Sequence, residues 1–365
     1  MDELEKARKE IDAIDSEMAS LFERRMKAAE VIAAYKRERG LSVKDPVREA
    51  ALIEKCRSYI DDETIESYYV EHLENMIDLS CRYQSRLIDG MRIAYCGVEG
   101  AFAHIAAKRM FPEGELVSCP DFADAYHSVE DGAFDCAVLP LENSYAGEVG
   151  AVMDLIFSGS LFVNQVVDLS IRQNVVAKKG TAREQIKTVV SHPQALQQCA
   201  GYIRKMGLET QTCSNTAVAA KLVQDSDDPT IAAIASGETA ELYDLDIIDS
   251  GINDNQNNTT RFAALSRVQN KPSSGKVRED EAFILVFTVQ NKAGALAQTL
   301  NIIGAHGFNM RSLRSRPMKD LQWNYYFYIE AEGNINNANG RDMLRELSEI
   351  CARLKLVGTF FTDNE

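Results

Sequence analysis

Two cations lie on one stripe of a long predicted helix at the N-terminus, with apolar residues between them. At 3.6 residues per turn, Arg25 and Lys36 differ in direction by only about 20°, and they lie about 16 Å apart along the helix axis. Their long side chains can lean toward each other over Ala29 and Ile32, because the apolar stems pack while the charged heads reach outward. The gap between the two cations suits a small, rigid dianion. Isolated surface cations are more often simply solvated, so this interpretation depends on the neighbouring segments.

A short second segment supplies another cation and two carboxylates. Asp45, Arg48 and Glu49 open a predicted second helix, and Pro46 occupies a position that suits a first helical turn. Only one short loop separates this segment from Lys36. It can therefore fold back onto the first stripe.

A predicted third helix places polar residues on an apolar face. Ser80 and Gln84 are spaced i, i+4, so they share one side of the helix. The apolar residues of the same stripe are Tyr69, Leu73, Met76, Ile77 and Leu87. Polar side chains on a core-facing stripe need hydrogen-bond partners, which a bound ligand can supply.

Further along the chain, small polar clusters follow several predicted strands. The Gly-bearing turn GVEGAFAH at 97–104 can present backbone N–H groups to a carboxylate. Each cluster alone is more often turn or capping chemistry than catalysis. Together they are poor in strong bases and suit carboxylate binding and proton donation rather than covalent chemistry. Their candidate residues are Asn143, Ser144, Gln194, Thr260, Arg261 and Phe262.

Composition narrows the class of protein. The chain has 365 residues, is 45% hydrophobic and carries a net charge of -15, which argues against nucleic acid and anionic membranes as partners. No run approaches the roughly 20 apolar residues of a membrane span, and the charged N-terminus does not read as a signal peptide. The eight cysteines are scattered without C-x-x-C spacing, which indicates reduced thiols in a cytoplasmic protein with no metal site.

The elements that must position these residues fall into three regions. Residues 1–90 read as three helices, the first near 35 residues long, with Asp61 and Asp62 available to cap the third. The first helix has more apolar surface than two short neighbours can cover, so we expect a dimer. Arg8 lies about 100° around the helix from Arg25, and could therefore reach a partner's site but not that of its own chain.

From residue 91 to 270, alternating strands and helices predict an α/β domain. A faint internal repeat indicates two similar lobes with a cleft between them, where ligands meet strand ends and helix N-termini. A polar linker, NKPSSGKVRED, precedes a module at 280–365 with strands and two helices. This module is suited to dimerisation through a sheet edge.

The first region resembles the all-helical chorismate mutases, an intertwined dimer of three-helix chains. That family has an Arg from the partner chain followed by R-x(10)-K, D-x-x-R-E and S-x-x-x-Q. The resemblance implies that Lys36 and Gln84 stabilise the ether oxygen of chorismate as its bond breaks. The remaining positions would hold the carboxylates, ring and hydroxyl, and they are Arg8, Arg25, Asp45, Arg48, Glu49 and Ser80.

The second region is similar to prephenate dehydratases, which are two-lobed and like periplasmic binding proteins in fold. It carries GVEGAFA, Glu142-Asn143-Ser144, SHPQALQQC and Thr260-Arg261-Phe262 where that family has a GPEGTFS-like turn, ENS, SHPQAL-QC and TRF. The resemblance implies that Thr260 donates a proton to the leaving hydroxyl and that Phe262 packs against the ring. Asn143, Ser144, Gln194 and Arg261 would bind the carboxylates and the oxo group.

The third region resembles the amino-acid-binding ACT module, an α+β ferredoxin-like fold. The resemblance implies phenylalanine as an inhibitory effector, bound at a dimer interface. Its effector-binding residues would be Gly294, Ala295, Leu296, Asn309, Ser315 and Arg316. Two departures from the family motifs leave the strength of inhibition open. In the Gly-turn of the second region, Ala101 and Ala103 replace the usual hydroxyl residues. In the ESRP motif of the third region, Arg314 replaces the Glu.

In this order the three regions match bifunctional chorismate mutase–prephenate dehydratases of phenylalanine biosynthesis, which need no cofactor. The substrates would be chorismate and prephenate, and the assembly a homodimer or a tetramer. Three alternatives remain open. The dehydratase could act on arogenate, the helical domain could be mainly regulatory, or the two lobes could form a non-catalytic amino-acid sensor.

Overall fold

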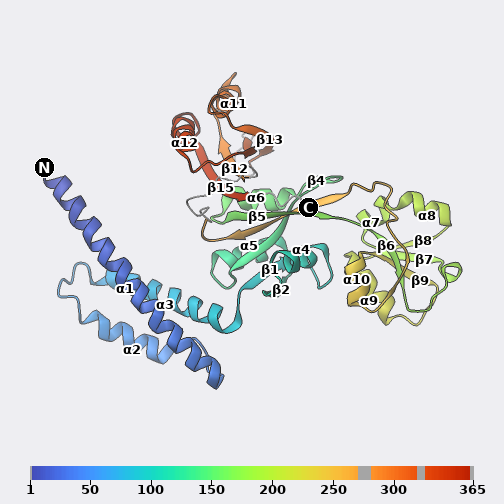
Figure 1. Ribbon diagram of the computed structural model, residues 1–365, viewed down its shortest axis with the longest axis horizontal. Helices are drawn as coiled ribbons and strands as arrows, with labels where there is room; N and C mark the ends of the chain where they lie inside the picture. The colour runs from blue at the N-terminus through green and yellow to red at the C-terminus, as the bar shows by residue number, and fades with distance from the viewer. Residues whose placement is uncertain (1, 270–280, 319–324, 362–365) are drawn as a thin grey trace. The chain divides into compact units, whose positions relative to one another are not determined.

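The computed structural model describes residues 2–269, 281–318 and 325–361 (Figure 1). The chain forms two compact units, residues 1–92 and 93–365, and each is described by itself. The expected linker at 270–280 lies outside the described residues. Within the described ranges, no helix is both long and apolar enough to cross a membrane.

The first unit consists of three helices, α1 (Glu3–Arg39), α2 (Pro46–Arg57) and α3 (Glu66–Asp89). Asp2 caps α1 by accepting a hydrogen bond from the Glu5 amide at 2.8 Å, and Gly40 ends it in the left-handed conformation. Asp45 caps α2 ahead of Pro46 in its first turn. The three predicted helices and the place of Pro46 in the first turn of the second helix are thereby confirmed.

The prediction that Asp61 or Asp62 caps α3 is wrong. This helix follows Ile65 without a side-chain cap, so neither Asp61 nor Asp62 plays that part. Asp62 instead accepts hydrogen bonds from the hydroxyl and the amide of Thr64, which lower the pKa of its carboxyl group.

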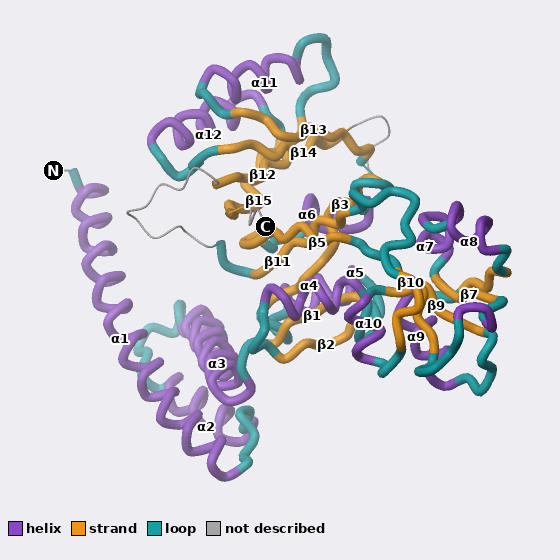
Figure 2. The backbone as a smooth tube through the Cα atoms, turned by 45° about the vertical axis from the view of Figure 1, so that its right-hand side comes forward, coloured by secondary structure: helices purple, strands orange, loops and turns teal. Residues whose placement is uncertain are grey.

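Much of α1 extends past its neighbours (Figure 2). With 37 residues it is about 55 Å long, against about 36 Å for the 24 residues of α3. Its buried residues are Ala29 and Ala33, whereas Ile32, expected in the floor, is 41% exposed. The large apolar side chains exposed on the N-terminal half of α1 are Leu4, Ile11, Ile14, Met18, Leu21 and Phe22. In a single chain, this half of α1 therefore presents an uncovered apolar stripe.

The second unit begins with two lobes. Lobe 1 contains β1 (Arg92–Cys96), α4 (Phe102–Met110), β2 (Glu115–Cys119), α5 (Phe122–Glu130), β3 (Cys136–Asn143), β4 (Gly147–Glu148), α6 (Gly150–Ser158), β5 (Phe162–Ser170) and β11 (Thr259–Ser266). Its sheet has the order β2-β1-β3-β11-β5, with β4 paired to β3. β1 and β3 are parallel, whereas β11 is antiparallel to both of its neighbours.

Lobe 2 contains β6 (Asn174–Ala177), a 3-10 turn (Arg183–Gln185), β7 (Thr188–Ser191), α7 (Pro193–Gln198), α8 (Ala200–Met206), β8 (Glu209–Thr212), α9 (Thr216–Asp225), β9 (Ile231–Ala235), α10 (Gly237–Leu242) and β10 (Asp246–Asp249). Its sheet order is β10-β6-β9-β7-β8. The orders β2-β1-β3 and β8-β7-β9 correspond, which confirms the internal repeat. Two segments, 171–173 and 250–258, connect the lobes.

Besides the two-residue strand β4, two strands of the lobes were not predicted from the sequence. β6 is short and fully buried, and β11 follows a run of asparagines that reads as a loop. β11 nevertheless occupies the interior of the lobe 1 sheet, between β3 and β5. Long-range pairing with two strands therefore decides the conformation of this segment, and the Thr-Arg-Phe motif lies on a strand.

The C-terminal module has the element order of a ferredoxin-like fold. It contains β12 (Glu281–Thr288), α11 (Ala295–Ala305), β13 (Asn309–Pro317), β14 (Tyr325–Glu332), α12 (Ala338–Ile350) and β15 (Arg353–Phe361). The antiparallel sheet order is β13-β14-β12-β15, so β13 is an edge strand. β13 was not predicted, because alternating charged and small residues give it no apolar run.

Both faces of β12 are buried, which explains its continuous apolar sequence. Phe283, Leu285 and Phe287 pack in a cluster with residues of α11 and α12. Ala282 and Ile284, on the other face, belong to the cluster that fills lobe 1.

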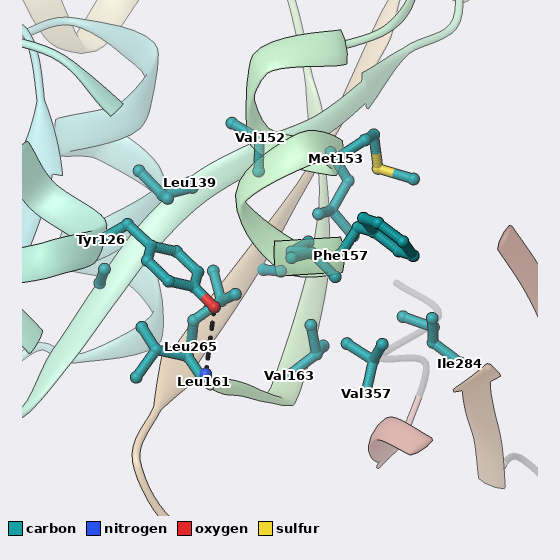
Figure 3. Packing of buried hydrophobic residues seen from close by; sticks show 14 of the residues in the cluster. Tyr126, Leu139, Val152, Met153, Phe157, Leu161, Val163, Leu265, Ile284 and Val357 are labelled. Atoms are coloured by element: carbon teal, nitrogen blue, oxygen red, sulfur yellow. Dashed lines mark hydrogen bonds between the residues drawn. The ribbon is translucent and has the colours of Figure 1, made fainter. Parts of the chain in front are cut away.

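Figure 3 shows where that second cluster joins the module to lobe 1. Ile284 and Val357 lie near Val163 and Phe157 of lobe 1. At Gly358, strand β15 of the module approaches strand β5 of lobe 1 so closely that a Cβ atom would overlap the Val163 carbonyl. The sheet face that the two module helices leave open is therefore packed on lobe 1.

Candidate active sites

The helical unit buries the two predicted polar residues of α3. Ser80 is 5% exposed and Gln84 is 7% exposed. Ser80 donates to the Met76 carbonyl at 3.0 Å, and Gln84 Nε2 donates to the Ser80 carbonyl at 3.2 Å. Gln84 Oε1 is a buried atom for which the described residues supply no hydrogen bond. Such an atom needs a partner, and a bound ligand or water can provide one.

The two cations of α1 are held by backbone carbonyls rather than by carboxylates. Arg25 donates to the Met76 carbonyl of α3 at 3.2 Å, and Lys36 donates to the Val43 carbonyl. Both side chains are half-buried. Carbonyl oxygens orient the two groups, and the described residues form no ion pair with either of them, which is the condition needed to attract an anion.

The segment that opens α2 forms a reciprocal cap. Asp45 accepts from the Arg48 amide at 3.1 Å, and the Glu49 carboxylate accepts from the Asp45 amide at 3.1 Å. Glu49 also accepts from the Cys81 thiol, and burial together with this carboxylate raises the pKa of that thiol. Arg48 is exposed at the start of the helix.

Arg8 is not part of this group in a single chain. It is exposed and lies 17 residues before Arg25, which is about 25 Å along a straight helix. No side chain spans that distance.

In the second unit, a cleft of about 760 Å³ lies between the two lobes. Asn143 and Thr260 lie opposite each other on β3 and β11 and both line this cleft. Asn143 Nδ2 donates to Thr260 Oγ1 at 2.8 Å. Phe262 lines the same wall, and Gln194 at the start of α7 lies across from it in lobe 2.

The surrounding hydrogen bonds fix the direction of the Asn143–Thr260 bond. Asn143 Oδ1 accepts from the amides of Tyr145 and Ala146 at 3.0 and 2.9 Å, so the amide NH₂ group must face Thr260. Asn258 Oδ1 takes the other Asn143 proton at 2.9 Å. Because the Thr260 oxygen accepts from Asn143, its own proton is available for a group in the cleft.

Two predicted members of this site lie elsewhere. Ser144 does not line the cleft. Its hydroxyl accepts a hydrogen bond from the Thr259 amide and donates one to the Asn257 carbonyl, which stabilises the start of β11. Arg261 faces the opposite side of the sheet from Thr260, because side chains alternate along a strand. Its guanidinium binds Asp168 at 2.8 Å and Glu330 at 3.0 Å.

The cleft also has neutral anion-binding groups, of which the N-terminus of α4 was expected from the Gly-bearing turn at 97–104, whereas the N-terminus of α9 and Gln173 were not. The N-termini of α4 and α9 reach it through Phe102 and Thr216. Ala101, at the N-cap of α4, makes no capping hydrogen bond, so the first amides of this helix are not engaged by its cap. Gln173, only 2% exposed, lines the cleft and has a buried Oε1 without a partner among the described residues.

The second glycine of the Gly-turn before α4 is Gly100, and its conformation and surroundings require a glycine. Its φ is +84°, and a Cβ atom would lie 3.0 Å from the Leu242 side chain of lobe 2. Thr239 of lobe 2 donates to the Gly100 carbonyl at 2.7 Å. A glycine here lets the two lobes meet at the edge of the cleft.

The charges around the cleft are few. Its described lining includes no Lys or Arg, and its only carboxylate is that of Glu148, which is paired with Arg316 at 2.7 Å. His192 accepts from the Gln194 amide through Nδ1, so its neutral form carries a proton on Nε2. Across the described ranges, no three His, Cys, Asp or Glu residues are grouped to hold a metal ion.

The expected effector residues divide into two groups within one chain. Gly294 precedes α11 in the left-handed conformation, and Ser315 shares a row of the sheet with Phe327 and Phe287 near that end. Asn309 lies at the far end of β13, six residues or about 20 Å away, and donates to Glu332. The side chain of Arg316 points toward lobe 1, where it binds Glu148 and Asp154.

These folds and sites describe a multidomain enzyme with two separate candidate active sites and a small C-terminal module. Family models match at residues 7–85 (chorismate mutase type II), 93–270 (prephenate dehydratase) and 283–349 (ACT domain). A bifunctional chorismate mutase/prephenate dehydratase from Neisseria gonorrhoeae is 32% identical over 97% of this chain and 96% of its own length.

An arogenate dehydratase/prephenate dehydratase from Arabidopsis thaliana is 32% identical over 75% of this chain and 73% of its own length. Among solved structures, a prephenate dehydratase from Arthrobacter aurescens in complex with L-Phe is 26% identical. It matches 74% of this chain and 90% of its own, with a TM-score of 0.68. The chain belongs to the family of bifunctional chorismate mutase/prephenate dehydratases.

Proposed function

We propose that this protein converts chorismate to prephenate in its helical unit and prephenate to phenylpyruvate in the cleft between its lobes. The observation that carries the second reaction is the Asn143–Thr260 hydrogen bond at the cleft wall. The first is supported by Arg25 and Lys36, which form no ion pair with the described residues, and by the buried Gln84 Oε1, which has no hydrogen-bond partner among them. We also propose a cytoplasmic location, for which the eight free cysteines are the supporting feature.

The dehydratase step loses carbon dioxide and a ring hydroxyl. The electron pair of the carboxylate that leaves as CO₂ moves into the ring, and the carbon–oxygen bond of the hydroxyl breaks. Thr260 donates a proton to the departing oxygen, which leaves as water, and Thr260 then recovers a proton from solvent. Asn143 supports this role because its N–H bond to Thr260 Oγ1 stabilises the negative charge left on that oxygen.

Carboxylate recognition in the cleft depends on neutral donors. The amides at the N-termini of α4 and α9, with Gln194 and Gln173, are the groups that face the ligand space. Such donors bind anions without cationic side chains. Arg261, expected earlier as a carboxylate ligand, has no place in this scheme.

The mutase step is a rearrangement of a dianion that needs neither a base nor a nucleophile. Negative charge develops on the ether oxygen as its bond breaks, and donors that face this oxygen favour the transition state over the substrate. Lys36 and Gln84 take that role, and Arg25 holds a carboxylate. Arg48 and Glu49, at the start of α2, orient the ring and its hydroxyl, while Asp45 caps α2 and Ser80 donates to the Met76 carbonyl within α3.

A second copy of the chain completes this site in our proposal. The uncovered apolar stripe on α1 needs a partner surface, and half-exposed side chains of this size each gain roughly 1 kcal/mol on burial. A partner helix laid along this stripe brings the partner subunit's Arg8 to the dianion. We therefore propose a homodimer built on α1.

We further propose that phenylalanine binds the C-terminal module and inhibits the dehydratase. The two groups of effector residues are about 20 Å apart along β13 within one chain, and the free edge of this strand can pair with a second copy. Because the module also packs on lobe 1, binding is best measured on the full chain. Calorimetry with L-phenylalanine that detects no binding to the intact dimer contradicts this proposal.

Arogenate is the second candidate substrate, since some relatives carry that name. It has an ammonium group where prephenate has an oxo group. Glu148, the described carboxylate of the cleft lining, is already neutralised by Arg316, which favours prephenate. Separate assays with chorismate, prephenate and arogenate decide among the proposals. Absence of turnover of chorismate or prephenate refutes the corresponding reaction.

A further inference from the structure

Four charged side chains lie on the face of the lobe 1 sheet opposite the cleft, directly behind the Asn143–Thr260 pair. Glu142 and Arg261 belong to lobe 1 and are cross-strand neighbours on β3 and β11. Arg314 and Glu330 belong to β13 and β14 of the C-terminal module. We call these four residues the back-face cluster.

The register of the two strands links the cluster to the cleft. Asn143 pairs with Thr260, and the adjacent rung pairs Glu142 with Arg261. Because side chains alternate between faces, one rung presents the hydrogen-bonded pair to the cleft and the next presents the charged pair to the module. Each charged residue is thus joined directly through the backbone to a residue of the cleft pair.

Residues of the module form ion pairs with both charged residues of lobe 1. Arg314 forms an ion pair with Glu142, and its guanidinium lies 5.8 Å from the centre of the Tyr328 ring. Arg261 Nη1 donates to both carboxylate oxygens of Glu330, at 3.1 and 3.0 Å. The Glu330 side chain is only 4% exposed, so this bond is shielded from water.

The cluster alternates in sign and carries no net charge. Arg261 has Glu330 on the module side and Asp168 on the next strand of its own sheet. Hydrogen bonding to Asp168 raises the pKa of Arg261, so the guanidinium stays charged. Arg314 takes a position where the family motif has Glu, a residue that would repel Glu142 here.

We propose that Arg314 and Glu330 are positioning residues for the dehydratase reaction, which act through Glu142 and Arg261 on the placement of Asn143 and Thr260. The C-terminal module is then part of the active arrangement and not only the site of an inhibitor. This inference rests on the dehydratase activity proposed above. Proton donation depends on placement within a fraction of an ångström, so the cluster affects turnover more than substrate binding.

The test compares a single and a double variant in the full chain. Arg314→Glu places two carboxylates together, and Glu142→Gln with Arg314→Glu removes this repulsion without placing a second cation beside Arg261. We expect Arg314→Glu to lower the dehydratase kcat about tenfold, with KM changed by less than about threefold, and the double variant to recover most of the loss. Because the mutase site lies in the other compact unit, near-UV circular dichroism and thermal unfolding of the same samples report whether each variant is folded.

Arg353→Gln is the matched control. Arg353 is also an arginine of the module that contacts lobe 1, but it donates to the Phe157 carbonyl at the end of α6, away from the cluster. We expect its kcat to remain at the wild-type value. If Arg314→Glu does not give folded protein, Arg314→Gln takes its place, with a smaller expected loss of kcat.

Three results overturn the inference. The first is a kcat within twofold of wild type in both Arg314 variants, and the second is an effect on KM alone. The third is a double variant with no more activity than Arg314→Glu. A wild-type enzyme with no dehydratase activity refutes the proposed function instead, so the two failures are distinct.

Discussion

Mixing two inactive variants tests whether the mutase site is shared between two chains. Arg8 lies about 25 Å from Arg25 along α1, so it can serve a site only in a partner. Loss of a charged hydrogen-bond donor costs about 1.5–3 kcal/mol, which lowers activity roughly 10- to 150-fold. We therefore expect the Arg8→Ala and Lys36→Ala homodimers each to retain little mutase activity.

The mixture has a defined expected activity. After dissociation and random reassociation of equal amounts, half of the dimers contain one chain of each kind. In each mixed dimer, the Arg8→Ala chain keeps Lys36 and receives Arg8 from its partner, while the other site lacks both groups. One of two sites in half of the dimers gives about one quarter of the wild-type activity for a two-fold symmetric dimer.

The matched control mixes Arg25→Ala with Lys36→Ala. Both residues belong to the same chain's site, so every site in the mixture lacks one of them and no activity returns. The assay is the loss of chorismate absorbance at saturating substrate, before and after mixing. No recovery in the Arg8–Lys36 mixture refutes the shared site, and near-normal activity of Arg8→Ala alone refutes the role of Arg8.

The remaining predictions concern single residues. Thr260→Val should lower dehydratase kcat by about 10²–10⁴ while mutase activity stays unchanged, and a near-normal rate contradicts its role as proton donor. Asn143→Ala should cost far less in the Thr260→Val background than alone, and additive losses would show that the two do not act together. Gln84→Glu should lose mutase kcat/KM as pH rises, because a carboxyl with an ordinary pKa of about 4.3 must be protonated to donate, whereas a pH profile like that of wild type contradicts the assignment. Burial lowers the pKa of Lys355, which donates to the Ile156 carbonyl, to about 8. Above that pH the unfolded chain binds a proton that the folded chain does not, so the free energy of unfolding should gain a rising component between about pH 8 and 10. Thermal unfolding of Lys355→Met should lack this component, and an unchanged slope refutes it.

Local periodicity predicted much of the fold, because helices and buried strands repeat their apolar residues at fixed intervals. The i, i+4 spacing of Ser80 and Gln84 within an apolar stripe correctly indicated two buried polar groups. The repeat in the α/β region correctly indicated two lobes of matching strand order. Strands β11 and β13 were missed, because their polar sequences become strands only through pairing with distant segments.

The same limitation misplaced Arg261. The Thr-Arg-Phe motif was counted among the polar clusters that follow predicted strands, where neighbouring side chains can point into one cleft. On strand β11, alternation separates Thr260 from Arg261, and the partners of Arg261 are Asp168 and Glu330. No local pattern relates a residue near 261 to a carboxylate near 330.

The sequence by itself therefore determined the domain order, the family and the residue types available for both reactions. These follow from spacing along the chain, which is local information. The tertiary structure decided the hydrogen bond that directs the Thr260 proton, the packing of both faces of β12 and the ion pair between Arg314 and Glu142. Each of these depends on which faces of distant strands meet, and that is set by the packing of the whole unit.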